Sequence, residues 1–359
     1  MNPGTGSVPA PASHASGAAS AAPTDPFSPI LAFLRASGLA RADETPPAVP
    51  LTGGVSSDIW KVELARGPVC VKRALPRLRV AQVWEAPVSR NRYERLWLEA
   101  VGALIPGAAP QVLASDADGF FAMEYLAPSA HPLWKAELAA GRSDVAFAAA
   151  TGAALARIHA HTAGDAQVAE RFATDAAFYA IRLEPYLIAT GRAHPALAAR
   201  LQALSDTTAA HRLALVHGDV SPKNILQRPG PQGATPVFLD AECAWYGDPA
   251  FDLAFCLNHL LLKCLWVPPA TAGFLAAFEA FHAAYLAGVD WEPREALESR
   301  TAALLPGLLL ARVDGKSPVE YLTTEPQRDT VRRAAIPLLQ APVQRLGALR
   351  EHWHKELQQ

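Results

Sequence analysis

The chain has 359 residues, of which 50% are hydrophobic and 18% charged, and a formal net charge of −2 at pH 7. This length predicts two domains or one two-lobed domain with a large hydrophobic core. The near-neutral charge argues against partners such as nucleic acid or an anionic membrane. The composition is therefore typical of an enzyme with a small-molecule substrate.

Cysteine usage and hydropathy favour a cytoplasmic location. The four cysteines, Cys70, Cys243, Cys256 and Cys264, lack the spacing of a metal site, so we expect buried free thiols. The most apolar stretch, 253–267, is shorter than the about 20 residues that span a bilayer. The N-terminus also lacks the basic and apolar regions of a secretory signal.

The first 25 residues differ in composition from the rest of the chain. Residues 1–25 are rich in Ala, Pro, Ser and Gly, and they predict a disordered tail because they cannot bury enough apolar surface to offset chain entropy. Apolar residues at helical spacing then predict a short helix over 27–39.

Segment 49–75 predicts strands joined by a glycine-rich turn. Gly53, Gly54 and Ser56 belong to this turn, where glycines let backbone N–H groups approach phosphate oxygens closely. Two glycines by themselves also mark an ordinary hairpin. Lys72 closes the last apolar strand, and its alternative interpretation is a plain surface lysine.

An amphipathic helix is expected over 90–104, and it offers Glu94 and Glu99. These residues are five positions apart and lie roughly 140° from each other around a helix, so only one can face a lysine on a neighbouring strand. Two strands follow, 111–113 and 120–126, on either side of an Asp-Gly turn.

From residue 127 the pattern becomes mainly helical. The expected helices are 144–161, 172–190, 195–204, 253–267, 271–287 and 293–311. A charged turn with Arg312 and Lys316 follows the last of them. The turn either simply ends the helix, or it brings Arg312 or Lys316 into the active site to bind an anionic acceptor or a phosphate.

The densest set of polar residues lies in the segment that begins at Leu215 and reads LVHGDVSPKNILQRPGPQGATPVFLDAECAWYGDPAFDLAF. Two short apolar runs, 213–216 and 237–239, predict the strands of a hairpin that is closed by the Pro/Gly-rich turn between them. Closing this hairpin would bring the loop 219–224 beside Asp240.

These residues together suit phosphoryl transfer. Asp219 could orient a hydroxyl and accept its proton, while the Asn224 amide oxygen and the Asp240 carboxylate could hold Mg²⁺. Each aspartate taken singly could be a turn residue or a helix N-cap. The ordered set, with apolar strands before both aspartates, favours the catalytic interpretation.

The combined motifs resemble those of the aminoglycoside phosphotransferase and choline kinase superfamily. The superfamily pattern is HGD-x₄-N, then an apolar strand that ends in a metal-binding Asp, then GDPxxDLA. It corresponds here to His217–Asp219, Asn224, Leu239-Asp240 and Gly247–Ala254. The stretch 72–94 is also similar to the first lobe of the methylthioribose kinase branch.

The resemblance implies an α+β, two-lobed protein-kinase-like fold. A small antiparallel-sheet lobe with one main helix would span 26–126, and a larger, mostly helical lobe would span 127–359. The phosphotransferase domain itself would cover about 49–320.

The resemblance also implies ATP and Mg²⁺ as cofactors. Lys72 would bind the ATP phosphates, and Glu94 would hold Lys72 in place. Glu94 is favoured over Glu99 because of its distance in sequence from Trp84. Backbone groups around Glu124 and Leu126 would bond adenine. The catalytic residues would be Asp219, Asn224 and Asp240, of which Asn224 and Asp240 would bind the metal. His217 would fix the loop backbone and Asp252 would brace it from beneath, with helix capping as the alternative for Asp252.

The expected reaction is ATP-dependent transfer of the γ-phosphoryl group to a hydroxyl of an aminoglycoside-, sugar- or amino-alcohol-like acceptor, by a monomer or homodimer. One alternative is a catalytically silent, nucleotide-binding regulatory protein, although Lys72, Asp219, Asn224 and Asp240 are all present. Another is a methylthioribose kinase-type sugar kinase, although that branch has a differently composed loop, HGDLHTGS. A protein kinase is disfavoured because no A-P-E segment follows Asp240.

Overall fold

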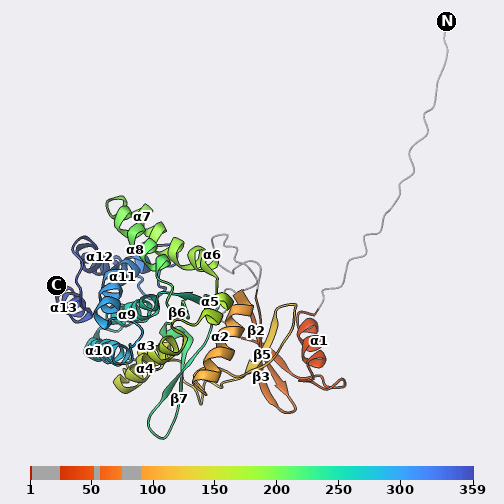
Figure 1. The fold of residues 1–359 in the computed structure, drawn as a ribbon. Coiled ribbons are helices and arrows are strands. Elements are labelled where there is room, and N and C mark those ends of the chain that lie inside the picture. Colours follow the sequence, from red (N-terminus) through yellow and green to blue (C-terminus); the bar gives the residue numbers. More distant parts are fainter. Residues whose placement is uncertain (2–24, 52–56, 75–89) are drawn as a thin grey trace.

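The computed structural model describes residue 1 and residues 25–51, 57–74 and 90–359. Its α+β architecture has a small antiparallel sheet at one end and a larger, mostly helical part at the other (Figure 1). In the described residues, all four cysteines are free and buried, as expected. No helix among them is both long and apolar enough to cross a membrane.

The sheet has five strands in the order β1-β2-β3-β5-β4, and all neighbours are antiparallel. Its strands are β1 (Ala48–Pro50), β2 (Ser57–Leu64), β3 (Gly67–Ala74), β4 (Val112–Ser115) and β5 (Phe120–Glu124). The expected turn between β4 and β5 is present, with Gly119 at a φ of +87° that favours glycine. Strands β4 and β5 are therefore joined by a short turn and form an antiparallel hairpin.

Two helices cover opposite faces of the sheet (Figure 1). Helix α1 (Ser28–Ala36) packs Ile30, Phe33 and Leu34 on one face and forms a separate small core there. Helix α2 (Arg90–Leu104) packs on the other face, and its Trp97 belongs to the main core of the helical part. Because α2 contributes to that core, it couples the sheet to the helices.

The helical part also contains two short two-stranded sheets. Its helices are α3 (Trp134–Ala139), α4 (Val145–Thr162), α5 (Ala166–Arg171), α6 (Asp175–Phe178), η1 (Tyr179–Ile188), α7 (Ala189–Ala193), η2 (Pro195–Leu197), α8 (Ala198–Ala210), η3 (Pro222–Asn224), α9 (Pro249–Trp266), η4 (Pro268–Ala270), α10 (Thr271–Ala287), α11 (Arg294–Asp314), α12 (Glu325–Gln340) and α13 (Leu346–Glu356). Helices α12 and α13 lie beyond the last helix that the sequence pattern predicted.

The predicted strand pairing around the central motif is wrong. Strand β6 (Ala214–Val216) pairs with β9 (Trp245–Gly247), whereas β8 (Thr235–Phe238) pairs with β7 (Ile225–Arg228). Strand β7, which follows the loop 219–224, is therefore the partner of β8 across the Pro/Gly-rich turn, and β6 is not. Leu239 still lies beside the loop, because its N–H donates to the carbonyl of Asn224 at 2.8 Å.

Helix α9 begins four residues earlier than the apolar pattern predicted. Pro249 occupies its first turn, and the carboxylate of Asp248 accepts a hydrogen bond from the N–H of Ala250 at 3.0 Å. Asp248 is therefore the N-cap, and Asp252 lies inside the helix. The expected helix 172–190 is instead divided into α6, the π-helix η1 and α7.

Candidate active site

Lys72 faces the interior because side chains alternate along β3. Val69 and Val71 belong to the small core under α1, so Lys72 lies on the opposite face of the sheet. There it pairs in register with Phe121, which belongs to the main core shared with α2. The lysine is only 2% exposed, which excludes the plain surface interpretation.

The buried amine of Lys72 contacts two carboxylates. Its Nζ lies 2.7 Å from Oε2 of Glu94 and 2.5 Å from Oδ1 of Asp240. Glu99 points elsewhere, toward Arg95 on the same helix at 2.7 Å. Helix phase therefore places Glu94, rather than Glu99, beside the lysine.

The contact between Lys72 and Asp240 favours the charged form of both residues. Burial acts to lower the pKa of Lys72, but Asp240 and Glu94 outweigh it and hold that pKa above its usual value. Burial likewise acts to raise the pKa of Asp240, but Lys72 and then Lys223 outweigh it and hold that pKa below its usual range. The ammonium and the Asp240 carboxylate are thus both charged at neutral pH.

Asp240 has an unusual backbone conformation, with a φ of +64°. In the described part of the chain it is the only non-glycine residue with a positive φ. Asp and Asn tolerate this backbone region better than most residues do. Such strain persists where surrounding contacts over-determine it. Here the preceding residue, Leu239, is held by Asn224 and by the ring of His217, whose Nε2 lies 3.0 Å from the Leu239 carbonyl.

His217 joins the loop to the strand that carries Asp240. Its Nδ1 accepts a hydrogen bond from the N–H of Asp219 at 3.1 Å, so the proton of the neutral ring resides on Nε2, which donates to Leu239. Burial lowers the pKa of His217, and this favours the neutral ring. Trp97 packs edge-on against it, with ring centroids 4.8 Å apart.

The carboxylate of Asp252 lies beneath the same loop. It accepts hydrogen bonds from the N–H groups of His217 at 2.7 Å and Gly218 at 2.8 Å, and it is fully buried. His159 on α4 approaches it at 3.3 Å. Asp252 therefore orders the backbone that presents Asp219, and Asp248 performs the capping that was the alternative for this residue.

Asp219 contacts two cations that sequence reasoning missed. Its Oδ2 lies 3.1 Å from Nη2 of Arg182 and 3.0 Å from Nζ of Lys223. Burial acts to raise the pKa of Asp219, but Lys223 and Arg182 outweigh it and lower that pKa. Lys223 follows Asp219 by four positions, and this short spacing is a signal in the sequence that could have identified it as a partner of Asp219. Arg182 is 37 residues away on η1, and its one signal is a lone arginine in an apolar run.

Asn224 and Asp240 fit the ligand chemistry of Mg²⁺. The Asn224 amide nitrogen donates to the backbone carbonyl of Asp219 at 3.0 Å, which leaves the amide oxygen directed away from that bond. No group of three or more His, Cys, Asp or Glu residues gathers as a metal site in the described ranges. Few hard oxygen ligands match a cation that completes its shell with phosphates and water.

A further carboxylate close to this group is Glu242, two residues after Asp240. Its Oε2 lies 3.2 Å from Nε of Arg90, the first residue of α2. Glu242 also acts on the pKa of Lys72, after Asp240 and Glu94. The pair Glu242–Arg90 therefore adds a second link between α2 and the segment that carries Asp240, and no sequence motif indicated it.

The remaining predicted site residues have mixed outcomes. Gly53, Gly54 and Ser56 lie outside the described residues. Glu124 ends β5, and its carboxylate lies 3.4 Å from Nη2 of Arg228, so the side chain is engaged with the helical part. Leu126 follows it and is buried, at the point where the chain passes from the sheet to the helices.

Arg312 and Lys316 behave differently from each other. Arg312 is buried near the end of α11, and its Nη1 donates to the hydroxyl of Tyr186 at 2.9 Å. Lys316 lies on the surface, where its Nζ is 2.8 Å from Glu184. Both residues therefore contact η1, the helix that carries Arg182, but only Arg312 does so from a buried position.

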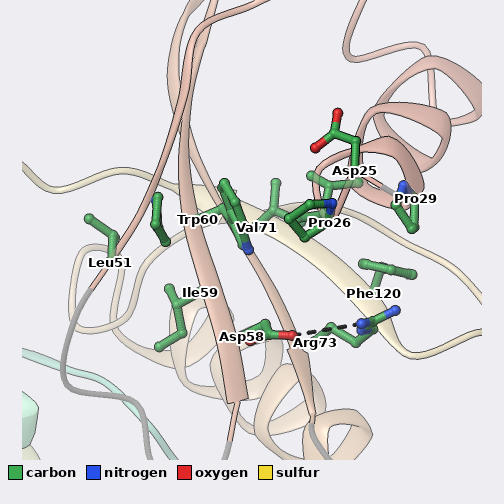
Figure 2. Close-up of a pocket in the computed structure, with 12 residues that line it drawn as sticks. Asp25, Pro26, Pro29, Leu51, Asp58, Ile59, Trp60, Val71, Arg73 and Phe120 are labelled. Carbon is green, nitrogen blue, oxygen red and sulfur yellow. Dashed lines mark ion pairs between the residues drawn. The ribbon is translucent and has the colours of Figure 1, made fainter. Parts of the chain in front are cut away.

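A cavity of about 450 Å³ opens on the α1 face of the sheet (Figure 2). Its lining includes Trp60, Val71 and the ion pair between Asp58 and Arg73, whose closest atoms are 3.7 Å apart. Because Val71 and Lys72 point to opposite faces of β3, this cavity is separate from the group around Lys72.

A family model described as the phosphotransferase enzyme family matches residues 47–297. This range contains every predicted site residue described above except Arg312 and Lys316. No curated protein matches the chain significantly in sequence.

Solved structures with a similar fold include three kinases of small molecules. A choline/ethanolamine kinase family protein from Mesorhizobium loti is 17% identical, with 93% of this chain and 99% of that chain covered and a TM-score of 0.50. Choline kinase from Cryptosporidium parvum is 12% identical, with 88% and 96% covered and a TM-score of 0.52. Spectinomycin phosphotransferase, in complex with ADP and spectinomycin, is 10% identical, with 92% and 98% covered and a TM-score of 0.50. At these identities the likeness shows the fold.

The expected two-lobed, protein-kinase-like fold is thereby confirmed, and so is membership of the aminoglycoside phosphotransferase and choline kinase superfamily. The comparisons do not confirm the methylthioribose kinase branch. The family match covers well over half of the chain. The chain therefore belongs to the phosphotransferase enzyme family and is a small-molecule phosphotransferase with a hydroxyl group as acceptor.

Proposed function

We propose that this phosphotransferase uses ATP and Mg²⁺, and that Asp219 is its catalytic base. The observation that carries the proposal is the convergence of Lys72, Asp240, Asn224 and Asp219 through the contacts described above. Lys72, held by Glu94, would bind the ATP phosphates. Mg²⁺, when bound by Asn224 and Asp240, would neutralise charge on those phosphates.

In the proposed reaction the acceptor hydroxyl oxygen attacks the γ-phosphorus. The bond from that phosphorus to the β–γ bridging oxygen breaks, ADP leaves, and the hydroxyl proton passes to the carboxylate of Asp219. Because Arg182 and Lys223 lower the pKa of Asp219, this carboxylate is a weak base and acts mainly by orienting the hydroxyl. A loose transition state places little demand on a strong base.

The proposal is tested with the purified full chain, ATP and Mg²⁺ across a panel of hydroxylated acceptors. The panel includes choline, ethanolamine, an aminoglycoside, methylthioribose and hydroxy acids, with ADP release and the phosphorylated product both measured. We expect Asp219→Asn to lower kcat by about 10²–10⁴-fold, the range for a positioned acid–base group. Its affinity for ATP should change little, because Asp219 contacts the acceptor.

A fully active Asp219→Asn variant would contradict the role of Asp219. ATP binding by the wild-type chain without phosphorylation of any acceptor would instead favour the silent, nucleotide-binding alternative. Phosphorylation of methylthioribose alone would identify a sugar kinase of that branch.

A further inference from the structure

The side of Asp219 that faces the helices is lined by basic and aromatic side chains. Arg182, which contacts Asp219, lies over the rings of Tyr186 at 5.8 Å and Phe255 at 5.7 Å from their centroids. Tyr186 and Phe255 also pack on each other, with centroids 5.5 Å apart. A continuous layer thus leads from Asp219 away from the catalytic loop.

Arg312 lies on this layer next to Tyr186. Its guanidinium carbon is 5.5 Å from the Tyr186 ring centroid, and its Nη1 donates to the Tyr186 hydroxyl and to Ser317. The arginine is 8% exposed, and its Nε has no hydrogen-bond partner within the described part of the chain. Arg312 therefore retains an unused donor in a buried position.

Helix α9 continues the layer with His259 and Lys263. Phe255, His259 and Lys263 are four residues apart and share one face of the helix, over about 12 Å of its length. His259 packs against Phe255 at 5.5 Å between centroids, and its Nε2 has no partner among the residues the structure describes.

Lys263 is 1% exposed, and its amine lies 3.5 Å from the ring centroid of Tyr321 and 4.2 Å from that of Trp266. In the described ranges it forms no ion pair of 4 Å or less with a carboxylate. Burying a cation without an anion is costly, and aromatic faces offset only part of that cost.

The basic residues of this layer shift the pKa of His259, and one of them, Lys223, belongs to the catalytic loop. Burial lowers the pKa of His259, and the positive charges of Arg312, Lys263, Lys223 and Lys135 lower it further. Lys223 is also the residue that contacts Asp219. The basic layer and the catalytic carboxylate therefore belong to one electrostatic environment, with Glu320 paired to Lys135 at its outer end.

We infer that the acceptor carries an anionic group, a carboxylate or a phosphate ester, which binds Arg312 and Lys263 while its hydroxyl lies at Asp219. The inference rests on the proposed function and narrows its acceptor class. An anion would supply a partner for the Arg312 guanidinium and would favour the protonated form of the Lys263 amine. An acceptor with an ammonium group at the same place would meet like charges, and like-charge juxtaposition weakens binding.

The test compares matched acceptors that differ in charge. Glycerate and glycerol 3-phosphate are each paired with glycerol, and 4-hydroxybutyrate is paired with 4-aminobutanol. Each compound is titrated calorimetrically into the full chain loaded with Mg²⁺ and a non-hydrolysable ATP analogue, and is then assayed for turnover with ATP. The carboxylate and phosphate arms distinguish the two sources of negative charge.

We expect the anionic member of at least one pair to bind at least tenfold more tightly than its partner. Arg312→Gln and Lys263→Met should each raise KM for that anionic acceptor by tenfold or more and leave KM for ATP within about twofold. Lys316→Ala, on the surface four residues after Arg312, is the matched control and should change neither value. Arg312→Lys restores charge and should recover part of the affinity, which a purely structural defect would not allow.

Equal or tighter binding of the neutral or ammonium members would overturn the inference, and so would the absence of binding by every anionic member. If neutral or ammonium acceptors are phosphorylated efficiently, the inference fails while the proposed kinase function stands. If the chain fails to bind the ATP analogue, the proposed function fails first.

Discussion

The amine of Lys72 lies 2.5 Å from Oδ1 of Asp240, although the two residues are 168 positions apart in the chain. One comes from the sheet and the other from the helical part, so this contact joins the two halves of the fold. Without nucleotide, each charge has the other as its partner. Binding of a phosphate chain with Mg²⁺ would replace this direct contact with an anion for the lysine and a cation for the aspartate.

Asp240→Asn tests the role of this carboxylate without disturbing the backbone, because Asn also tolerates the φ of +64°. The amide removes the negative charge, so we expect the Mg²⁺ concentration for half-maximal rate to rise at least tenfold. The measurement is the initial rate against free Mg²⁺. Asp206→Asn, on the exposed face of α8, is the control. An unchanged Mg²⁺ dependence would exclude Asp240 as a metal ligand.

Arg182→Gln tests the residue that links Asp219 to the basic layer. Its guanidinium contacts the Asp219 carboxylate and also donates from Nε to the Gly218 carbonyl. We expect kcat to fall by about 10²-fold, because small displacements of a catalytic group have effects of that size.

Loss of the Arg182 charge should also raise the pKa of Asp219, since burial already favours the protonated form. The acidic limb of the pH profile of kcat should therefore move to higher pH. Arg192→Gln is a matched control, because Arg192 pairs with Glu184 at the surface. Equal effects of the two variants would show that Arg182 has no special role.

Gly218→Ala should be strongly destabilising. Its φ is +78°, and an added Cβ would lie 2.6 Å from the Cys243 carbonyl oxygen. Gly119→Ala is the matched control, because Gly119 has a φ of +87° but no atom within 4 Å of the added Cβ.

Both variants carry the conformational cost of positive φ, roughly 1–2 kcal/mol. Only Gly218→Ala adds overpacking, which costs about 1–3 kcal/mol more. Urea denaturation of both variants measures this difference. Equal stabilities would mean that the loop and the Cys243 segment separate easily.

The amine of Lys263 provides a pH signature for the binding of an anionic acceptor. Burial, and then Lys135 and Arg312, lower the pKa of Lys263 to about 6, while Glu320 acts in the opposite direction. Tyr321 and His259 complete its surroundings. In the free protein the amine is therefore mostly neutral at pH 7.5, and a bound anion would raise its pKa.

Binding at pH 7.5 should accordingly take up a proton, and affinity should fall as the pH rises above 6. Calorimetric titrations in buffers of different ionisation enthalpy measure the uptake. It should disappear in Lys263→Met and persist in Lys316→Ala. Proton release on binding, or uptake that survives Lys263→Met, would contradict this prediction.

Local patterns in the sequence determined the parts of the site that depend on neighbouring residues. Alternation along β3 places Lys72 opposite Val71, and helix phase separates Glu94 from Glu99. The five-residue spacing of Asp219 and Asn224 forms one loop, in which the Asn224 side chain bonds the Asp219 backbone. These features follow from fixed periods of strands and helices, so they can be recognised without the fold.

Only the tertiary structure decided which distant segments meet. Strand β6 pairs with β9, contrary to the predicted hairpin, because a strand can bond any partner of suitable direction and the local pattern does not identify it. Arg182 reaches Asp219, and Lys263 joins the same basic layer, through the packing of η1 and α9. The neighbours that determine the role of these charges are remote in the chain. The proposed charge of the acceptor therefore follows from the fold and not from the motifs.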